Sequence, residues 1–398
     1  MVWRALRGGS LACALAAALA LPAAASAPAP VPRGFVGVNV DGPIFPGTAP
    51  GVNLNAQLGA MVAAGVESIR VVFDWSYAQP YRSPSEVPAA LQSQFVTVGG
   101  VPTRFSQIDE IVGLAARHGL TVLPTVMYAP SWDVTGNSSQ SFGRPARTGP
   151  YAAFLTDLID RYGPHGSFWH GYGTKLPIRR WQIWNEPDQV GFWPTQPFAK
   201  TYVALLRAAH AAVGAADPGA QVVLAGLPDF SWKLLASIYA IHGARSLFDV
   251  VGVHPYTGTP AGVITIIGKV RHVMDRFGDA SKPIIADEWG WPSSVGQTPP
   301  VDSDITTTEK GQARNVAALM PLLAADRRQL GLAGFYFYTW AGAENRGASA
   351  FSFAGLLRYH AGKLTRKPAF AAFKRAALAM EGCRRRGALA SECAVRTR

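Results

Sequence analysis

The sequence predicts an α/β protein built as a single (β/α)₈ TIM barrel, and three observations lead to this prediction. Eight short β-rich runs alternate with longer amphipathic stretches, which is typical of parallel βαβ units. The runs are almost entirely apolar, as expected for strands that are covered on both faces. Residues 34–378 hold the eight units, and one barrel domain commonly reaches this length.

The predicted elements follow one another in a regular order. The eight strands are residues 35–40, 68–73, 121–127, 180–184, 221–225, 250–254, 283–286 and 334–338. Apolar residues at helical spacing predict helices at 105–118, 151–162, 198–213, 231–241, 263–277 and 312–323. A last helix begins near Lys367-Pro368, because proline suits a first helical turn. A doubly wound open sheet is the alternative, but its glycine-rich phosphate loop is missing after the first strand.

The first 27 residues have the features of a secretory signal peptide. Arg4 and Arg7 precede an apolar stretch at 11–21, and small residues that suit cleavage follow at Ala25 and Ala27. The apolar stretch is shorter than the roughly 20 residues of a membrane span. We therefore expect a secreted protein, extracellular or periplasmic, with a proline-rich linker at 28–33 before the barrel.

Residues 379–398 form a basic tail with a cysteine pair. Cys383 and Cys393 are the two cysteines left after signal removal, and in an oxidising compartment we expect a disulfide between them, with free thiols as the alternative. Removal of the signal peptide lowers the net charge from +12 to +10, and half of this remainder lies in the C-terminal stretch that begins at Phe373, which argues against a nucleic-acid partner. The tail is either a solvated end or a weak contact to acidic surface polymers. We expect a monomer.

Two glutamates stand at strand ends in similar settings. Glu186 lies in Trp184-Asn185-Glu186-Pro187, at the end of the fourth strand, and Glu288 ends the seventh strand within Asp287-Glu288-Trp289. The active sites of such barrels lie at the C-terminal ends of the strands, and the fourth and seventh strands face each other across the barrel. Two carboxylates placed in this way can flank a glycosidic bond.

With both motifs in place, the chain resembles the clan A glycoside hydrolases, most closely family 39 and next family 5. The resemblance implies a retaining double displacement on O-glycosidic bonds, with Glu186 as acid/base and Glu288 as nucleophile. Family 39 xylosidases carry a further β-domain after the barrel that this chain lacks, which favours endo-action on a polysaccharide or oligosaccharide. Xylan, mannan, β-glucan and bacterial exopolysaccharides all stay open as substrates.

The resemblance also assigns residues that bind the substrate or support the nucleophile. Arg70 supports Glu288, Asn185 bonds the sugar 2-hydroxyl, and His254 and Tyr256 contact sugar and nucleophile. Trp340 forms the aromatic floor, while Asn39 and Tyr128 are further candidates. Arg70, His254 and Trp340 each also have a structural interpretation as ion-pair, core or packing residues. Asp287 is expected to be structural and, by strand alternation, to point away from Glu288.

The expected chemistry follows from charge. Arg70 and Tyr256 should keep Glu288 ionised, whereas burial and the charge of Glu288 should raise the pKa of Glu186. About half of a group of strand-end aromatic residues should contact sugar: Trp75, Tyr77, Tyr128, Trp132, Trp193, Trp289, Trp291 and Trp340.

Composition and motifs exclude several other classes. Charged residues make up 16% of the chain and aromatic residues 11%, which excludes a disordered chain. There is no Gly-x-Ser-x-Gly elbow, no Walker loop and no His-Glu-x-x-His, so we expect neither cofactor nor metal. The alternative function is a non-catalytic carbohydrate-binding or cell-surface protein on the same barrel.

Overall fold

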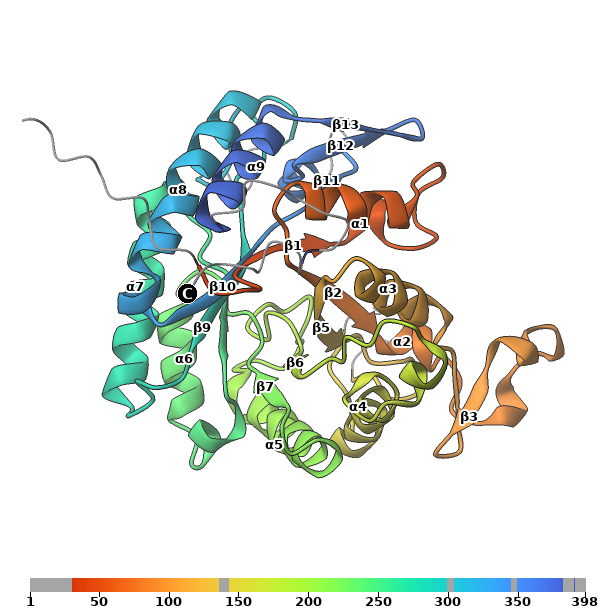
Figure 1. Cartoon of the computed structure of the whole chain (residues 1–398). Coiled ribbons are helices and arrows are strands. Elements are labelled where there is room, and N and C mark those ends of the chain that lie inside the picture. The colour runs from red at the N-terminus through yellow and green to blue at the C-terminus, as the bar shows by residue number, and fades with distance from the viewer. Residues whose placement is uncertain (1–30, 136–142, 299–303, 345–348, 382–389, 391–398) are drawn as a thin grey trace, which may run out of the picture.

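The computed structural model describes residues 31–135, 143–298, 304–344, 349–381 and 390. Its centre is a barrel of eight parallel strands surrounded by helices (Figure 1). The barrel strands are β1 (Val36–Val40), β2 (Ser68–Asp74), β5 (Thr121–Met127), β6 (Arg180–Ile183), β7 (Gln221–Val223), β8 (Val251–Val253), β9 (Ile284–Trp289) and β10 (Leu332–Phe337). Each overlaps one of the eight predicted runs.

The strand order shows that the sheet closes on itself. Neighbouring strands follow the order β7-β6-β5-β2-β1-β10-β9-β8, and every pairing is parallel. Parallel bridges from Val223 to Val250 and from Leu227 to Val253 connect the β7 segment to the β8 segment. The (β/α)₈ prediction is therefore confirmed, and the open-sheet alternative is wrong.

The helices lie outside the barrel; α1 and α2 were not predicted, and the other seven begin close to their predicted positions. They are α1 (Leu54–Ala63), α2 (Trp75–Ala78), α3 (Ser106–Arg117), α4 (Thr148–Tyr162), α5 (Ala199–Ala216), α6 (Ser231–Tyr239), α7 (Pro260–Arg276), α8 (Glu309–Leu330) and α9 (Pro368–Glu381). The side chains of Thr259 and Thr308 cap α7 and α8 by accepting from backbone N–H groups. The last helix begins at Pro368, as its sequence predicts.

Two apolar layers stabilise the barrel. The large outer layer lies between strands and helices and includes fully buried aromatic residues such as Trp181 and Tyr151. A small inner layer fills the barrel axis with Leu123, Val223 and Tyr336, among others. Burying one such large side chain contributes about 1.5–3 kcal/mol. The barrel interior is therefore a packed core and not a pore.

Several elements outside the barrel were not predicted. A hairpin of β3 (Val96–Val98) and β4 (Val101–Thr103) projects sideways from the barrel (Figure 1). A small sheet of β11 (Ala341–Gly342), β12 (Leu357–His360) and β13 (Lys363–Arg366) packs beside α1. The 3₁₀ helices are η1 (Gly42–Ile44), η2 (Pro84–Glu86), η3 (Ala89–Gln94), η4 (Ser167–Gly171), η5 (Ala244–Leu247) and η6 (Ala350–Phe353).

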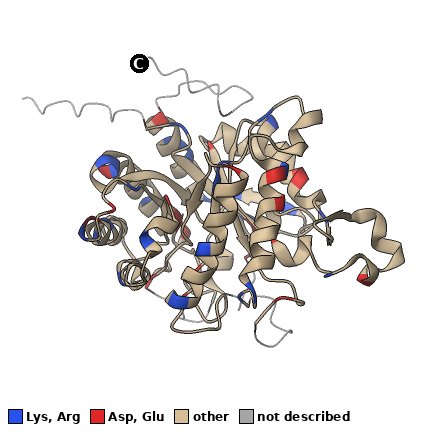
Figure 2. Ribbon diagram, turned by 90° about the horizontal axis from the view of Figure 1, so that it is seen from below, with Lys and Arg blue, Asp and Glu red and all other residues tan. Residues whose placement is uncertain are grey.

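Figure 2 shows basic and acidic residues interleaved around the outer helices. The predicted signal peptide and the Cys383–Cys393 disulfide lie outside the described residues, as does most of the basic tail. Among the residues that are described, none of the helices has the length and apolar character needed to cross a membrane.

Candidate active site

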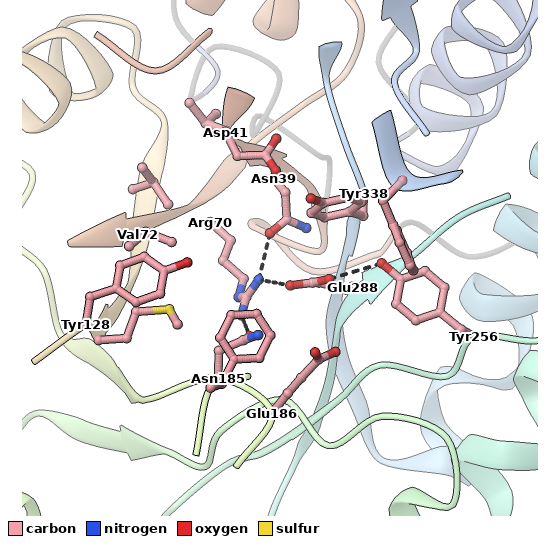
Figure 3. A pocket seen from close by; sticks show the side chains of 15 residues that line it. Asn39, Asp41, Arg70, Val72, Tyr128, Asn185, Glu186, Tyr256, Glu288 and Tyr338 are labelled. Atoms are coloured by element: carbon pink, nitrogen blue, oxygen red, sulfur yellow. Dashed lines mark hydrogen bonds and ion pairs between the residues drawn. The ribbon is translucent and has the colours of Figure 1, made fainter. Parts of the chain in front are cut away.

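A cavity of about 380 Å³ opens at the C-terminal ends of the barrel strands (Figure 3). This is the end at which the sequence places the site. Its lining residues are Asn39, Val40, Asp41, Arg70, Val71, Val72, Met127, Tyr128, Asn185, Glu186, Phe192, Tyr256, Glu288, Tyr338 and Phe351. Seven of the nine predicted site residues are among them; His254 and Trp340 are not.

Glu288, the next-to-last residue of β9, is held by two donors. Arg70 Nη1 lies 2.6 Å from Glu288 Oε1, and the Tyr256 hydroxyl donates to Oε2 over 3.0 Å. The predicted contacts of Arg70 and Tyr256 with this carboxylate are present. Burial and nearby negative charge raise the pKa of Tyr256 well above its usual value, so this hydroxyl stays a donor. These two contacts fix the direction of the Glu288 carboxylate.

Glu186 follows β6 in a segment with unusual backbone geometry. Trp184 and Glu186 both have positive φ, a conformation that costs non-glycine residues of order 1–3 kcal/mol and is frequent at functional sites. Glu186 N–H donates to the Gly226 carbonyl, which ties the turn to the segment after β7. Burial raises the pKa of Glu186, and the charge of Glu288 adds to that shift. The turn thus presents a buried carboxyl group whose pKa lies above its usual value, although the contact with His254 opposes part of the shift.

The two glutamates lie close together in the cavity. One oxygen of Glu186 lies within 4.8 Å of an oxygen of Glu288. Carboxyl pairs of retaining glycosidases are about 5–5.5 Å apart, and those of inverting enzymes about 6.5–9.5 Å. The distance between these two oxygens is thus closer to the spacing of retaining enzymes than to that of inverting enzymes.

Arg70 joins several polar side chains at the floor of the cavity by hydrogen bonds. Its Nε donates to Gln182 Oε1 (2.7 Å), Nη1 to Asn39 Oδ1 (2.8 Å) and Nη2 to Asn185 Oδ1 (2.6 Å). The amide oxygen of Asn185 is therefore occupied, and its amide nitrogen is the group that can donate to a sugar hydroxyl. Gln182 was not predicted, although a polar residue between Trp181 and Ile183 in an apolar strand could have indicated it.

His254 lies beneath the cavity and not in its wall. The ring is fully buried, in space that only a glycine at 226 leaves open, since a Cβ there would lie 1.9 Å from Nε2. Nδ1 bonds Glu186 Oε1 at 2.7 Å, and Nε2 lies 3.4 Å from Asp287 and 3.6 Å from Glu288. The structure thus corrects the predicted sugar contact of His254: the imidazole bridges the carboxylates from below.

The charge state of His254 follows from these neighbours. Burial alone would lower its pKa, but Glu288, Asp287 and Glu186 outweigh burial and raise the pKa to about 10. The folded protein therefore carries an imidazolium between its carboxyl groups at neutral pH.

This imidazolium predicts a pH dependence of stability. Between pH 6.5 and about 10, folded His254 keeps a proton that the unfolded side chain has lost. The stabilisation is complete below pH 6.5 and should then decline by about 1.4 kcal/mol per pH unit as pH rises. Urea unfolding at a series of pH values measures this slope. His254→Gln should lack it, and equal slopes in the two proteins would contradict the assignment.

Asp287 departs from the predicted orientation. Four residues of β9, from Ala286 to Trp289, face three of β10, from Phe335 to Phe337, so β9 carries a bulge. The bulge breaks strand alternation, and Asp287 points to the same interior as Glu288, bonding Gln182 and lying 3.6 Å from Arg70 Nε. Burial favours its neutral form, but His254 and Arg70 overcome burial and lower its pKa. Asp287 is thus fully buried and points inward, so the predicted orientation is wrong.

Trp340 does not contact the cavity. It is fully buried, donates from Nε1 to Gln57 and packs on Phe370. Tyr338, two residues earlier, lines the cavity in its place. Of the eight aromatic residues expected near sugar, Tyr128 alone is in the cavity wall, so the estimate of one half is wrong. The other aromatic wall residues are Phe192, Tyr256, Tyr338 and Phe351.

One group in the described chain has the spacing of a metal site. Glu186, His254 and Glu288 each offer an atom within 4.8 Å of the other two. A histidine ligand must be neutral, whereas the acidic neighbours of His254 keep it protonated at neutral pH. These three side chains therefore fit two carboxyl groups bridged by a protonated histidine better than they fit the ligands of a metal ion.

Comparison with known proteins finds structural but not sequence matches. No family model matches the chain, and no curated protein sequence does. A glucosidase from Croceicoccus marinus covers 88% of this chain (69% of its own) with a TM-score of 0.59 and 16% identity. The GH39 enzyme from Xanthomonas axonopodis pv. citri covers 88% (67% of its own) with 0.60 and 17%. The GH53 catalytic domain of Ignisphaera aggregans covers 87% (98% of its own) with 0.55 and 17%.

These likenesses are likenesses of fold. At 16–17% identity, the three structures share the barrel with this chain. The expected resemblance to glycosidases, family 39 among them, is thus found in structure and is not detectable in these sequence comparisons.

Proposed function

We propose that the chain is a retaining glycoside hydrolase that uses Glu186 as acid/base and Glu288 as nucleophile. The observation that carries the proposal is the pair of carboxyl groups within 4.8 Å of each other, at the mouth of a barrel. The fold shared with a glucosidase and a GH39 enzyme supports it. The N-terminal signal features support action on a polysaccharide or oligosaccharide outside the cytoplasm, and endo-action belongs to the same proposal.

The first step breaks the glycosidic bond and forms a glycosyl-enzyme. Glu288 Oε attacks the anomeric carbon as Glu186 gives its proton to the leaving oxygen, so that the departing sugar leaves as an alcohol. Arg70 and Tyr256 hold Glu288 in one direction for the attack. Because burial raises its pKa, the carboxyl group of Glu186 can hold the proton that it gives to the leaving oxygen.

The second step releases the sugar by hydrolysis. Once Glu288 is bound to sugar its negative charge is gone, so the pKa of Glu186 falls and the ionised group can take a proton from water. The resulting hydroxide attacks the anomeric carbon, and Glu288 leaves as a carboxylate. His254 donates to Glu186 and stabilises its ionised form in this step.

The cluster is electrically balanced in the resting state. Arg70 and protonated His254 supply two positive charges, which match Asp287 and Glu288 when Glu186 is protonated. The balance persists in the glycosyl-enzyme, where Glu186 carries the charge that Glu288 has lost. A constant net charge keeps the cost of burial similar in both steps.

The test is product release across a polysaccharide panel of xylan, mannan, β-glucan and bacterial exopolysaccharides. We expect oligosaccharides from one polymer with the wild-type protein and none with Glu288→Gln. Release of monosaccharide alone would keep the hydrolase and replace endo-action by exo-action. Tight binding to one glycan without any product would instead favour the alternative of a carbohydrate-binding protein.

Glu186→Gln should lower activity in a way that depends on the leaving group. With a natural oligosaccharide, kcat/KM should fall by about 10²–10⁴-fold, because no acid protonates the leaving oxygen. With a 2,4-dinitrophenyl glycoside, which leaves without protonation, the first step should be nearly unaffected. Pre-steady-state release of dinitrophenol measures this step. Equal losses on both substrates would remove Glu186 from the acid role.

The pH profile gives a second readout of the same residue. The alkaline limb of kcat/KM should lie above the range of an ordinary glutamate, because burial raises the pKa of Glu186. In the wild-type protein that limb should be present on the natural oligosaccharide and missing on the dinitrophenyl glycoside, whose departure needs no proton from Glu186.

A further inference from the structure

Asp41 is a carboxylate in the cavity wall that the proposed mechanism does not use. It follows β1 directly and lines the cavity together with Asn39 and Tyr338. In the strand order, β1 is three strands away from β6, so Asp41 lies across the barrel mouth from Asn185 and Glu186. Figure 3 shows this separation, with Asp41 beside Asn39 on the far side of Arg70.

The side chain of Asp41 is fixed by two hydroxyl groups. Thr339 Oγ1 donates to Oδ1, and Tyr338 also hydrogen-bonds the carboxylate. Each carboxylate oxygen can accept about two hydrogen bonds, so acceptor capacity remains for a ligand in the cavity. Burial raises the pKa of Asp41, and in such a poorly solvated wall a hydrogen bond to a ligand is stronger than in water.

The charges in the wall favour an uncharged ligand. Asp41, Glu186 and Glu288 supply three carboxyl groups, whereas Arg70 supplies the one cation among the described lining residues. Each nitrogen of Arg70 already donates to a protein oxygen. The other cation nearby, His254, lies below the wall and bonds Glu186. A carboxylate on the substrate would thus meet Asp41 and no unpaired cation among the described lining residues.

We propose that Asp41 determines the sugar at the cleavage site, by accepting hydrogen bonds from hydroxyls remote from the anomeric carbon and by repelling a uronic acid. This inference rests on the proposed glycosidase function and adds the substrate class: the sugar that binds here is neutral. Asn185 lies at the end of the cavity that holds the acid/base Glu186. The sugar hydroxyls remote from the anomeric carbon are therefore the ones that Asp41 can bind.

The experiment compares three proteins on matched aryl glycosides. The substrates are the 4-nitrophenyl β-D-glucoside, β-D-mannoside, β-D-xyloside and β-D-glucuronide, and the 4-deoxy form of the best neutral one. For the wild-type protein we expect cleavage of a neutral glycoside with at least about 10²-fold preference over the glucuronide. Asp41→Asn should lower kcat/KM on the neutral glycoside by about 10- to 100-fold, and it should narrow the preference over the glucuronide.

The deoxy substrate and a control variant separate a specific effect from a general one. The loss caused by Asp41→Asn should shrink on the 4-deoxy glycoside, because the hydroxyl that Asp41 binds is gone. Asp160→Asn, which removes an exposed carboxylate on α4, should match wild type on every substrate. Thermal unfolding verifies that Asp41→Asn is folded. The preference for the glucoside over the glucuronide is measured on the wild-type protein alone, so this part of the test does not depend on the folding of the variant.

The outcomes distinguish this inference from the proposed function. If wild type cleaves none of the glycosides and none of the panel polymers, the glycosidase function itself fails. If wild type is active but prefers the glucuronide, the inference on Asp41 is overturned while the function stands. The same holds if folded Asp41→Asn stays within twofold of wild type on the neutral glycoside.

Discussion

Glu288→Gln should lower kcat by about 10⁵-fold or more, the scale of loss found when a covalent nucleophile is removed. The amide has nearly the shape of the carboxylate and can still meet Arg70 and Tyr256, so the cavity should keep its form. Sugar binding should therefore be largely retained, as measured by calorimetry with the panel polymer that wild type cleaves. Initial rates on the same polymer measure the loss.

A surface variant controls for this measurement. Glu110→Gln makes the same chemical change at an exposed position of α3 and should leave the rate unchanged. Full activity in Glu288→Gln would remove the residue from the nucleophile role. Loss of both turnover and binding would point to damage of the cavity instead.

Arg70→Met should destabilise the fold by about 3–5 kcal/mol, the range expected when one partner of a buried ion pair is removed. The change leaves Asp287 and Glu288 facing each other without their guanidinium and removes the donors to Asn39 and Asn185. Urea unfolding at neutral pH measures the free energy of unfolding. Activity should be lost as well, because nothing then fixes the direction of Glu288.

Two further variants sharpen this prediction. Arg70→Lys keeps the charge but not the planar fork, so it should recover part of the stability while activity stays low. Arg179→Met breaks a surface pair with Asp217 at 3.8 Å, and should cost less than about 1 kcal/mol. An Arg70→Met protein as stable as Arg179→Met would show that the buried network contributes little.

The barrel was predictable because its pattern is local. Each apolar strand and each amphipathic helix is read from a window of about ten residues, and their alternation implies the parallel sheet. The β3–β4 hairpin and the β11–β13 sheet were missed because their strands have two to four residues and little apolar periodicity. Their existence depends on contacts with the barrel and not on their own sequence.

The site was predictable where a residue's place follows from its strand. Glu186, Glu288 and Tyr256 lie at or near strand ends and Arg70 lies within β2, and the structure brings all four into one cavity. Prediction failed where backbone detail decides direction. A one-residue bulge turns Asp287 inward, and the turn after β10 places Tyr338, not Trp340, in the cavity wall.

Buried polar residues were the hardest to assign from sequence. Gln182 and His254 sit in or beside apolar strands, and nothing local indicates that they connect the carboxyl groups to Arg70. Their role follows from their partners, which come from β2, β6, β8 and β9 together. Such a network becomes visible only when the barrel closes.

The central claim is that Glu288 forms a covalent bond to sugar, and a mechanism-based label tests it most directly. Wild type is incubated with the 2-deoxy-2-fluoro glycosyl fluoride of the sugar that it cleaves, and its intact mass and peptide map are then measured. We expect a mass increase of one fluoroglycosyl group, carried by Glu288 and absent from Glu288→Gln. A label on another residue, or unlabelled enzyme that releases sugar of inverted configuration, would contradict it.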